Sequence, residues 1–158
     1  QPLVFRLAFR LLCDEDEAKD MVQETFVKVW LALGKYNGEC RFSTWIYKIT
    51  CNTCYDRLRS LYHSPLDNEA DYSVSVNISS DDNVELAVVN KQLRELILRY
   101  TDELSPRQRL IFTLRDIEEL DVPEVQTITG LSAGIIKTTL YLARKNIRNK
   151  MNQIDAGL

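Results

Sequence analysis

The chain has 158 residues and a mass of 18.3 kDa, with 45% hydrophobic and 27% charged residues, a mixture typical of one globular domain or two small ones. No apolar run approaches the roughly eighteen residues that span a bilayer, and a single histidine, His63, argues against a His-rich metal site or a Ser-His-Asp triad. The opening residues lack a secretory signal pattern, and because residue 1 is Gln rather than Met, we expect that further residues precede it.

The acidity of the chain is concentrated in its middle. The formal net charge is −3 and the isoelectric point about 5.3, values that by themselves argue against a nucleic-acid partner. Residues 1–60 and 91–158, however, carry net charges of +1 and +2, whereas residues 61–90 carry −6 and no lysine or arginine. Five basic and no acidic residues lie between positions 137 and 150, which predicts a local basic surface.

The beginning of the chain predicts two helices. Leucines at positions 3, 7 and 11 share one face of a short helix over 3–12. Asp14 and Glu17 have the spacing of a capping box that starts a second helix, and Gly34 is its expected C-terminal end. The expected core stripe of this second helix is Ala18, Val22, Phe26, Val29 and Leu33.

A third helix is predicted to run from about residue 43 to about residue 61. Asn37-Gly38 marks a turn before it, and Ser43 or Thr44 is the expected N-cap. Its candidate core residues are Trp45, Ile49 and Leu58. We therefore expect an all-helical first domain over residues 1–62.

The middle of the chain is expected to be a linker. Residues 62–83 are rich in Ser, Asn and Asp and lack helical periodicity, so we interpret 63–84 as a flexible acidic linker. A short strand over 72–78 is the alternative, and His63 at the linker edge is expected to be a solvated surface residue. The predicted fold class is all-α, with a second small helical domain over 85–158.

The second domain has sharper helix boundaries. Apolar residues alternate at spacings of three and four over 86–100, which predicts an amphipathic helix. Ser105-Pro106-Arg107-Gln108 combines an N-cap, a proline at the first helical position and a capping-box glutamine. The helix that it starts carries three candidate core residues, Leu110, Ile111 and Leu114.

The last two helices form a helix-turn-helix pattern. Asp121-Val122-Pro123-Glu124 is a capping box that starts a helix to about residue 129, and Gly130 can adopt positive φ in the following turn. Ser132 caps a final helix from residue 133 to about residue 151, with an apolar stripe of Ile136, Leu140, Ala143 and Ile147.

A helix of this kind can enter the major groove of DNA. Its outer face offers side chains for phosphates and base edges: Lys137, Thr138, Thr139, Tyr141 and Lys145. Arg144, Arg148 and Lys150 extend a basic flank suited to the phosphate backbone. The alternative is a solvated basic helix that only complements its own dipole.

Both ends of the chain also carry longer motifs. Residues 104–116 (Leu-Ser-Pro-Arg-Gln-Arg-Leu-Ile-Phe-Thr-Leu-Arg-Asp) precede the Gly130 turn and residues 136–145 (Ile-Lys-Thr-Thr-Leu-Tyr-Leu-Ala-Arg-Lys). Near the beginning stand residues 14–26 (Asp-Glu-Asp-Glu-Ala-Lys-Asp-Met-Val-Gln-Glu-Thr-Phe) and 42–59 (Phe-Ser-Thr-Trp-Ile-Tyr-Lys-Ile-Thr-Cys-Asn-Thr-Cys-Tyr-Asp-Arg-Leu-Arg). In sequence and order these motifs resemble extracytoplasmic-function (ECF) RNA polymerase sigma factors of the sigma-70 family.

The resemblance implies a protein that binds core RNA polymerase, directs it to promoters and catalyses no reaction itself. The first domain would bind the clamp coiled coil of the polymerase through Asp20, Gln23 and Glu24, whereas Phe26 is expected to lie in the core. The second domain would bind the flap and recognise the duplex −35 element through the outer face of the last helix, in particular through Lys137, Thr138 and Tyr141.

The third helix would recognise and help to melt the −10 element. Strand opening needs aromatic faces for unstacked bases, which Phe42, Trp45, Tyr47 and Tyr55 could supply, although Trp45 is expected mainly in the core. The candidate contacts with the −10 element are Asn52, Lys48, Tyr55, Arg57 and Arg59, of which Asn52 is the strongest.

Other features follow from the same resemblance. Family members commonly have arginine where this chain has Thr139 and often where it has Leu142, so we expect weaker attraction to phosphates. The acidic linker either mimics a phosphate chain in a polymerase channel or is a solvated tether. We expect an anti-sigma partner, often membrane-bound in this family, a cytoplasmic location, and no metal, cofactor or small-molecule substrate.

Two competing functions remain. A helix-turn-helix regulator that acts without core polymerase is one, although the first domain shows neither a receiver-like α/β pattern nor a dimerisation coiled coil. A zinc or thiol redox protein is the other, suggested by the Cys51-x-x-Cys54 pair. A zinc site needs about four ligands and no second pair exists, so reduced cysteines that pack in the fold are expected.

Overall fold

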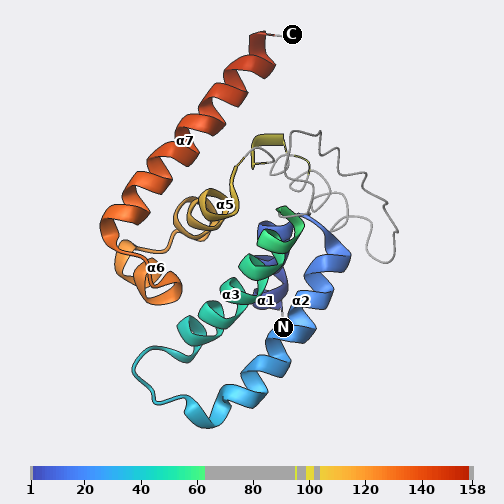
Figure 1. Cartoon of the computed structure of the whole chain (residues 1–158), viewed down its shortest axis with the longest axis vertical. Helices are drawn as coiled ribbons and strands as arrows, with labels where there is room; N and C mark the ends of the chain where they lie inside the picture. Colours follow the sequence, from blue (N-terminus) through green and yellow to red (C-terminus); the bar gives the residue numbers. More distant parts are fainter. Residues whose placement is uncertain (1, 63–94, 96–98, 102–103, 157–158) are drawn as a thin grey trace.

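The computed structural model describes residues 2–62, 95, 99–101 and 104–156, and all regular secondary structure among them is helical. None of the helices in these ranges is long and apolar enough to cross a membrane. Figure 1 shows an N-terminal and a C-terminal group of helices, which pack against each other. The predicted all-α fold is confirmed, whereas the boundaries of the two domains stay predictions.

The N-terminal group consists of three helices, α1 (Pro2–Leu12), α2 (Glu15–Ala32) and α3 (Phe42–Tyr62), with a short 3₁₀ turn η1 (Leu33–Lys35) after α2. Each of the three helices packs against the other two. Of the predicted Asp14–Glu17 capping box, the N-cap half is confirmed, because Oδ1 of Asp14 accepts a hydrogen bond from the backbone N–H of Glu17 at 3.0 Å. The Glu17 carboxylate instead accepts both of its hydrogen bonds from Arg57.

The buried face of α2 is rotated from the predicted stripe. It consists of Ala18, Met21, Thr25 and Val29. The predicted stripe contained Ala18 and Val29 but also placed Leu33 in the core, where the structure exposes this side chain. Val22 and Phe26 are only half-buried.

Two predicted helix ends are wrong. The helix α2 ends at Ala32, so Gly34 lies inside η1 and does not end the helix. The helix α3 begins at Phe42, so Ser43 and Thr44 are already helical and neither is its N-cap. The turn at Asn37-Gly38 is confirmed, since Gly38 has φ +75°. In the core of α3, Leu58 is buried as predicted but Trp45 and Ile49 are half-buried.

The C-terminal group comprises α5 (Pro106–Phe112), the π-helical turn η2 (Thr113–Ile117), α6 (Val122–Thr129) and α7 (Ala133–Ala156). The two capping boxes predicted for this group are present, Ser105 with Gln108 and Asp121 with Glu124, and a proline stands in the first turn of α5 and of α6. The predicted core side chains Leu110, Ile111 and Leu114 are buried, as are three of the four stripe residues of α7: Ile136, Leu140 and Ala143.

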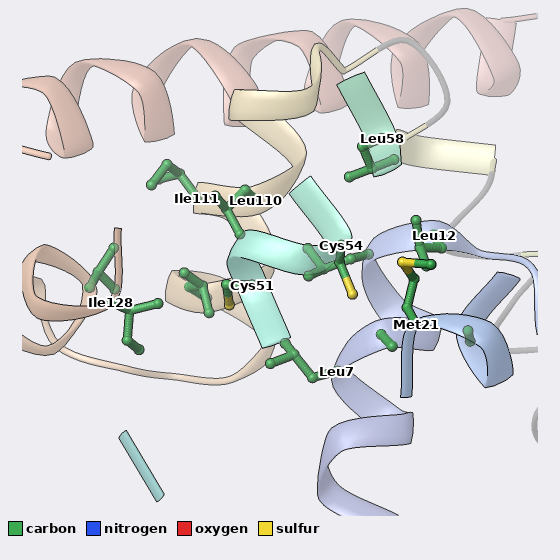
Figure 2. Close-up of a cluster of buried hydrophobic side chains, with 14 of the residues drawn as sticks. Leu7, Leu12, Met21, Cys51, Cys54, Leu58, Leu110, Ile111 and Ile128 are labelled. Atoms are coloured by element: carbon green, nitrogen blue, oxygen red, sulfur yellow. The ribbon is translucent and has the colours of Figure 1, made fainter. Parts of the chain in front are cut away.

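The two groups share one hydrophobic cluster. Helix α3 packs against both α5 and α6, and the buried side chains of both groups form a continuous contact network. Figure 2 shows Cys51 of α3 among side chains of both groups, with Ile128 of α6 and Leu110 of α5 nearby. The core therefore extends across the boundary between the N-terminal and C-terminal helices.

Several predictions fall outside the described residues. These are the linker over 63–84, the alternative strand over 72–78 and the position of His63. Of the helix predicted over 86–100, only Glu95 and residues 99 and 100 are described, and they are helical.

Candidate nucleic-acid and polymerase interfaces

The helix-turn-helix is built by local signals in the sequence. In the α6 capping box the carboxylate of Asp121 accepts from the backbone N–H of Glu124 at 2.8 Å, and the Glu124 carboxylate accepts from that of Asp121 at 3.1 Å. Gly130 ends α6 in the left-handed conformation with φ +73°, which a glycine adopts without strain. Ser132 Oγ then accepts from the N–H of Ile135 at 3.3 Å. These bonds fix the entry of α7.

The predicted −35 residues of α7 divide into three groups. Lys137, Thr138, Tyr141 and Lys145 have exposed side chains on the outer face of the helix. Thr139 is buried with Leu140, so its side chain packs within the C-terminal group and is not presented to solvent. Arg144 is exposed but is held by a carboxylate.

Arg144 forms a bidentate ion pair with Asp116 of η2. The Arg144 Nε donates to Oδ2 of Asp116 at 2.8 Å, and Nη2 donates to Oδ1 at 2.6 Å. The hydrogen bond to Asp116 is the main cause that raises the pKa of Arg144 above its usual value. Two donors that could face phosphates are therefore engaged within the protein.

The predicted −10 residues of α3 differ in whether their side chains are available to a partner. Lys48, Asn52 and Arg59 are exposed, and Tyr55 is half-buried with the guanidinium carbon of Arg59 6.0 Å from its ring centroid. Arg57 instead joins α3 to α2. Its Nε and Nη2 donate to the two carboxylate oxygens of Glu17, each at 2.6 Å, and this bonding raises the pKa of Arg57.

An aromatic cluster lies at the beginning of α3. The ring centroids of Phe42 and Trp45 are 5.6 Å apart, and Tyr36 is 5.4 Å from Phe42 and 5.2 Å from Trp45. The hydroxyl of Tyr36 donates to the carbonyl of Cys40 at 2.6 Å, which ties the preceding loop to the cluster. The sequence analysis did not include Tyr36 among the aromatic candidates for base contacts. Its position directly before the Asn37-Gly38 turn was the signal that could have identified it.

The predicted polymerase contacts of α2 lie along one groove. Asp20, Gln23 and Glu24 are exposed. They line this groove between α2 and α3 together with Glu17, Met21, Val27 and Arg57. Two large apolar side chains near the end of α2 are also exposed, Trp30 at 78% and Leu31 at 75%. The surface of α2 is therefore acidic at its beginning and apolar at its end.

The Cys51-x-x-Cys54 pair is buried in the core. Cys51 is 1% and Cys54 0% exposed, and none of the four cysteines forms a disulfide bond. Burial raises the pKa of Cys54 to about 12 and that of Cys51 well above the usual value, so both thiols are held protonated. Within the described ranges no three His, Cys, Asp or Glu residues are grouped so that they could hold a metal ion.

Comparison with protein families matches both groups of helices. Sigma-70 region 2 matches residues 1–63, and Sigma-70 region 4 matches residues 94–147. The two matches stand in the family's order and together cover most of the chain. The chain belongs to the sigma-70 family of sigma factors.

The relatives place this sigma factor in the ECF class. It is 28% identical over 144 residues to the ECF RNA polymerase sigma-E factor of Escherichia coli strain K12, covering 87% of this chain and 75% of that protein. It is 24% identical over 164 residues to the ECF RNA polymerase sigma factor SigW of Bacillus subtilis, covering 96% and 84%. Like other sigma factors it is an initiation factor that binds core RNA polymerase and promoter DNA, and not an enzyme.

Solved structures show the same fold. The sigma factor RpoE from Bartonella quintana, in a co-crystal with the anti-sigma factor NepR, superposes with a TM-score of 0.65 at 22% identity, covering 96% of this sigma factor and 91% of that chain. CnrH, in complex with the cytosolic domain of CnrY, superposes with a TM-score of 0.66 at 19% identity, covering 95% and 80%. The all-helical fold of this sigma factor is therefore that of two solved relatives.

Proposed function

We propose that this sigma factor uses three separate surfaces in initiation: α2 for core RNA polymerase, α3 for the −10 element and α7 for the −35 element. The observation that carries the proposal is the exposed polar face of α7 on a fully capped helix-turn-helix. Lys137, Thr138, Tyr141 and Lys145 form this face, and a major groove admits a helix of this size. Buried Thr139 and ion-paired Arg144 are excluded from it.

The α2 surface supports contact with the clamp coiled coil of the polymerase. Exposed Asp20 favours a basic partner, Glu24 is exposed but ion-paired with Lys28 at 2.7 Å, and Trp30 adds a large apolar contact at the other end of the helix. A helical partner that is basic at one end and apolar at the other would match this surface. The second domain would contact the flap.

The α3 surface supports recognition of single-stranded bases. Asn52 and Lys48 are exposed and one helical turn apart, and the cluster of Tyr36, Phe42 and Trp45 stands at the beginning of the same helix. Aromatic faces stack on unpaired bases, and amide side chains recognise base edges. Arg57 positions α3 through Glu17, so we assign it a structural role.

The complexes of the two solved relatives support regulation by an anti-sigma factor. The two solved relatives were each found in complex with another protein, one with an anti-sigma factor and one with a cytosolic domain. We therefore infer an anti-sigma partner for this chain, anchored in a membrane as is frequent in the family, and a cytoplasmic site of action beside RNA polymerase.

Transcription in vitro tests the assignment. Core RNA polymerase without a sigma factor is mixed with the full chain and genomic fragments from its source, and the transcripts are mapped. We expect promoter-specific transcripts that are lost with Asn52→Ala and with Lys137→Ala. Asn152→Ala is the matched control, because Asn152 is also exposed on a helix but lies beyond the matched region 4.

Two other outcomes would count against the assignment. Transcripts that persist with both variants would show that α3 and α7 do not contact the promoter as proposed. Duplex binding by the chain alone, without core binding or transcripts, would favour a helix-turn-helix regulator that acts without polymerase.

A further inference from the structure

Two apolar side chains of α7 lie outside the core. Ile135 is 43% and Leu142 42% exposed, whereas the core side of the same helix buries Ile136, Leu140 and Ala143. Figure 1 shows α5 and α6 beside α7, and both helices pack against it. The helix therefore carries more apolar side chains than its packing within the described part of the chain uses.

The two exposed side chains lie on one line along the helix. They are seven residues apart, which is close to two helical turns, and exposed Thr138 stands between them. The line begins in the first turn of α7, where the N–H of Ile135 donates to Oγ of Ser132 at 3.3 Å. All three side chains end in methyl groups. We call Ile135, Thr138 and Leu142 the methyl stripe.

The methyl stripe adjoins the polar face that is proposed for the −35 element. Thr138 belongs to both, and Lys145 follows Leu142 by three residues, which places it one helical turn further along. Between positions 137 and 150 the helix carries five basic and no acidic residues. This charge favours a polyanion as the partner of the whole surface, and the exposed apolar groups require a polyanion that also displays apolar atoms.

Duplex DNA displays such atoms in its major groove. Thymine presents the O4 acceptor and the C5-methyl group there, whereas cytosine presents an N4 donor and carries only hydrogen at C5. The side chains of isoleucine and leucine form no hydrogen bonds, so they cannot distinguish donors from acceptors. Contact with a methyl group removes apolar surface of both partners from water. An aliphatic side chain at the base edges therefore selects thymine.

The length of the methyl stripe fits a short run of base pairs. Seven residues of α-helix rise about 10.5 Å, and successive base pairs are about 3.4 Å apart. Ile135 and Leu142 would therefore reach thymines about three base pairs apart, on either strand of the duplex.

We propose that Ile135 and Leu142 are specificity-determining residues that contact the C5-methyl groups of two thymines in the −35 element. The inference rests on the proposed function of α7. Contacts between basic side chains and phosphates hold the helix in the groove and are the same for every sequence. The methyl contacts form only where thymine is present, so they select the sequence at which the helix binds.

Deoxyuridine tests the proposal because it lacks only the methyl group of thymine and keeps its base pairing and its O4 acceptor. The promoter duplex identified by transcription in vitro is prepared with each thymine of its −35 element, on both strands, replaced in turn by deoxyuridine. Binding of the sigma factor with core RNA polymerase is then measured by fluorescence anisotropy of the labelled duplex.

We expect two of these replacements to weaken binding about fourfold each, equivalent to about 0.8 kcal/mol for one buried methyl group. Leu142→Ala should abolish the effect of one replacement and Ile135→Ala the effect of the other. In each case the variant has already lost the side chain that contacts that methyl group, so the two changes are not additive.

The chain offers a matched control on the same helix. Met151 is 43% exposed in α7 but lies beyond the matched region 4, so Met151→Ala should leave both fourfold effects unchanged. Ile135 and Leu142 are exposed to the same extent, so their alanine variants should remain folded. The deoxyuridine series with the unaltered protein needs no variant at all.

Three results would overturn the inference. Affinity that is unchanged by deoxyuridine at every position, or a −35 element without thymine, would show that no methyl group is recognised. Methyl effects that persist in both alanine variants would assign them to other side chains. Weaker binding of Leu142→Ala in a core polymerase titration without DNA, with both methyl effects retained, would assign the methyl stripe to a protein contact.

Failure of the proposed function would give a different result. If Lys137→Ala leaves the affinity for the duplex unchanged, α7 does not contact the −35 element and the proposed function is contradicted. If Lys137→Ala weakens binding while deoxyuridine has no effect, α7 does contact the duplex and only the recognition of methyl groups is wrong.

Discussion

Replacing Asp116 by asparagine should release Arg144 for contact with DNA. The Asp116 carboxylate accepts two hydrogen bonds from Arg144, at 2.8 and 2.6 Å, and holds the guanidinium on η2. The asparagine side chain would keep the size of the aspartate but lose the charge that makes this pair strong. The freed guanidinium would then lie on α7, one helical turn from Tyr141 and Leu140.

The magnitude follows from the exposure of the pair. The Arg144 side chain is 53% exposed, so the ion pair is screened by solvent and contributes at most about 1 kcal/mol to stability. The fold should therefore persist. One added phosphate contact steepens the dependence of log K on log salt by about 0.9 and tightens binding about eightfold at about 0.1 M salt.

The assay is fluorescence anisotropy of a labelled promoter duplex with the polymerase-bound sigma factor, at salt concentrations from about 0.05 to 0.3 M. Lys137→Ala is the comparison, because it should make the slope shallower by about 0.9. An unchanged slope for Asp116→Asn together with a shallower slope for Arg144→Ala would refute the reasoning. That pair of results would mean that Arg144 already contacts DNA in the unaltered protein.

Three further predictions concern α2, the helix turn and the core. Trp30→Ala should change the free energy of unfolding by less than about 0.5 kcal/mol, because the side chain is exposed, yet weaken binding in a core polymerase titration about tenfold or more. Gly130→Ala should lower the free energy of unfolding by about 1–2 kcal/mol in urea, because alanine is strained at φ +73°; no loss would contradict the turn geometry. Burial raises the pKa of Cys54 from 9.0 to about 12, so its contribution to stability is complete below pH 9 and is lost as pH rises toward 12. In urea unfolding above pH 9, Cys54→Ala should make this decline shallower, and an equal decline would exclude Cys54 as its source.

Local signals made the C-terminal group predictable from sequence. Ser105, Asp121, Gly130 and Ser132 act within a few residues of their own positions, and all four have the predicted roles. Such residues satisfy backbone groups at helix ends whatever the remainder of the fold does. The helix-turn-helix and its exposed basic face followed directly from them.

The N-terminal group was predicted less well because its helices expose apolar residues. Trp30 and Leu31 are largely exposed, and a pattern based on hydrophobicity assigns such residues to a core. Thr25 misleads in the other direction: it is fully buried, but a hydrophobic pattern assigns a hydroxyl-bearing residue to the surface. The hydrophobic pattern of α2 therefore did not reveal which face of the helix is buried. The residue before α3 is Arg41, which is not an N-cap residue type, so no local sequence signal marked the first residue of this helix.

The polar contacts between distant residues could not be predicted at all. Glu118 bonds to Arg10 across 108 positions, and Glu17 bonds to Arg57 across 40. Charged residues are common on helix surfaces, and nothing in the sequence selects these partners among the others. Only the packing of the helices brings them together, which is why Arg57 was assigned to DNA and Glu118 was not noticed.

The shared hydrophobic cluster has a consequence for the lifetime of the protein in a cell. Leu110 of α5, Ile128 of α6 and Cys51 of α3 belong to one buried cluster to which both groups contribute. A separated molecule would present these apolar side chains to water, and chaperones and proteases act on such surfaces. We expect a separated molecule that has not reached polymerase to be degraded first. The abundance of this sigma factor would then be set by how quickly polymerase captures it.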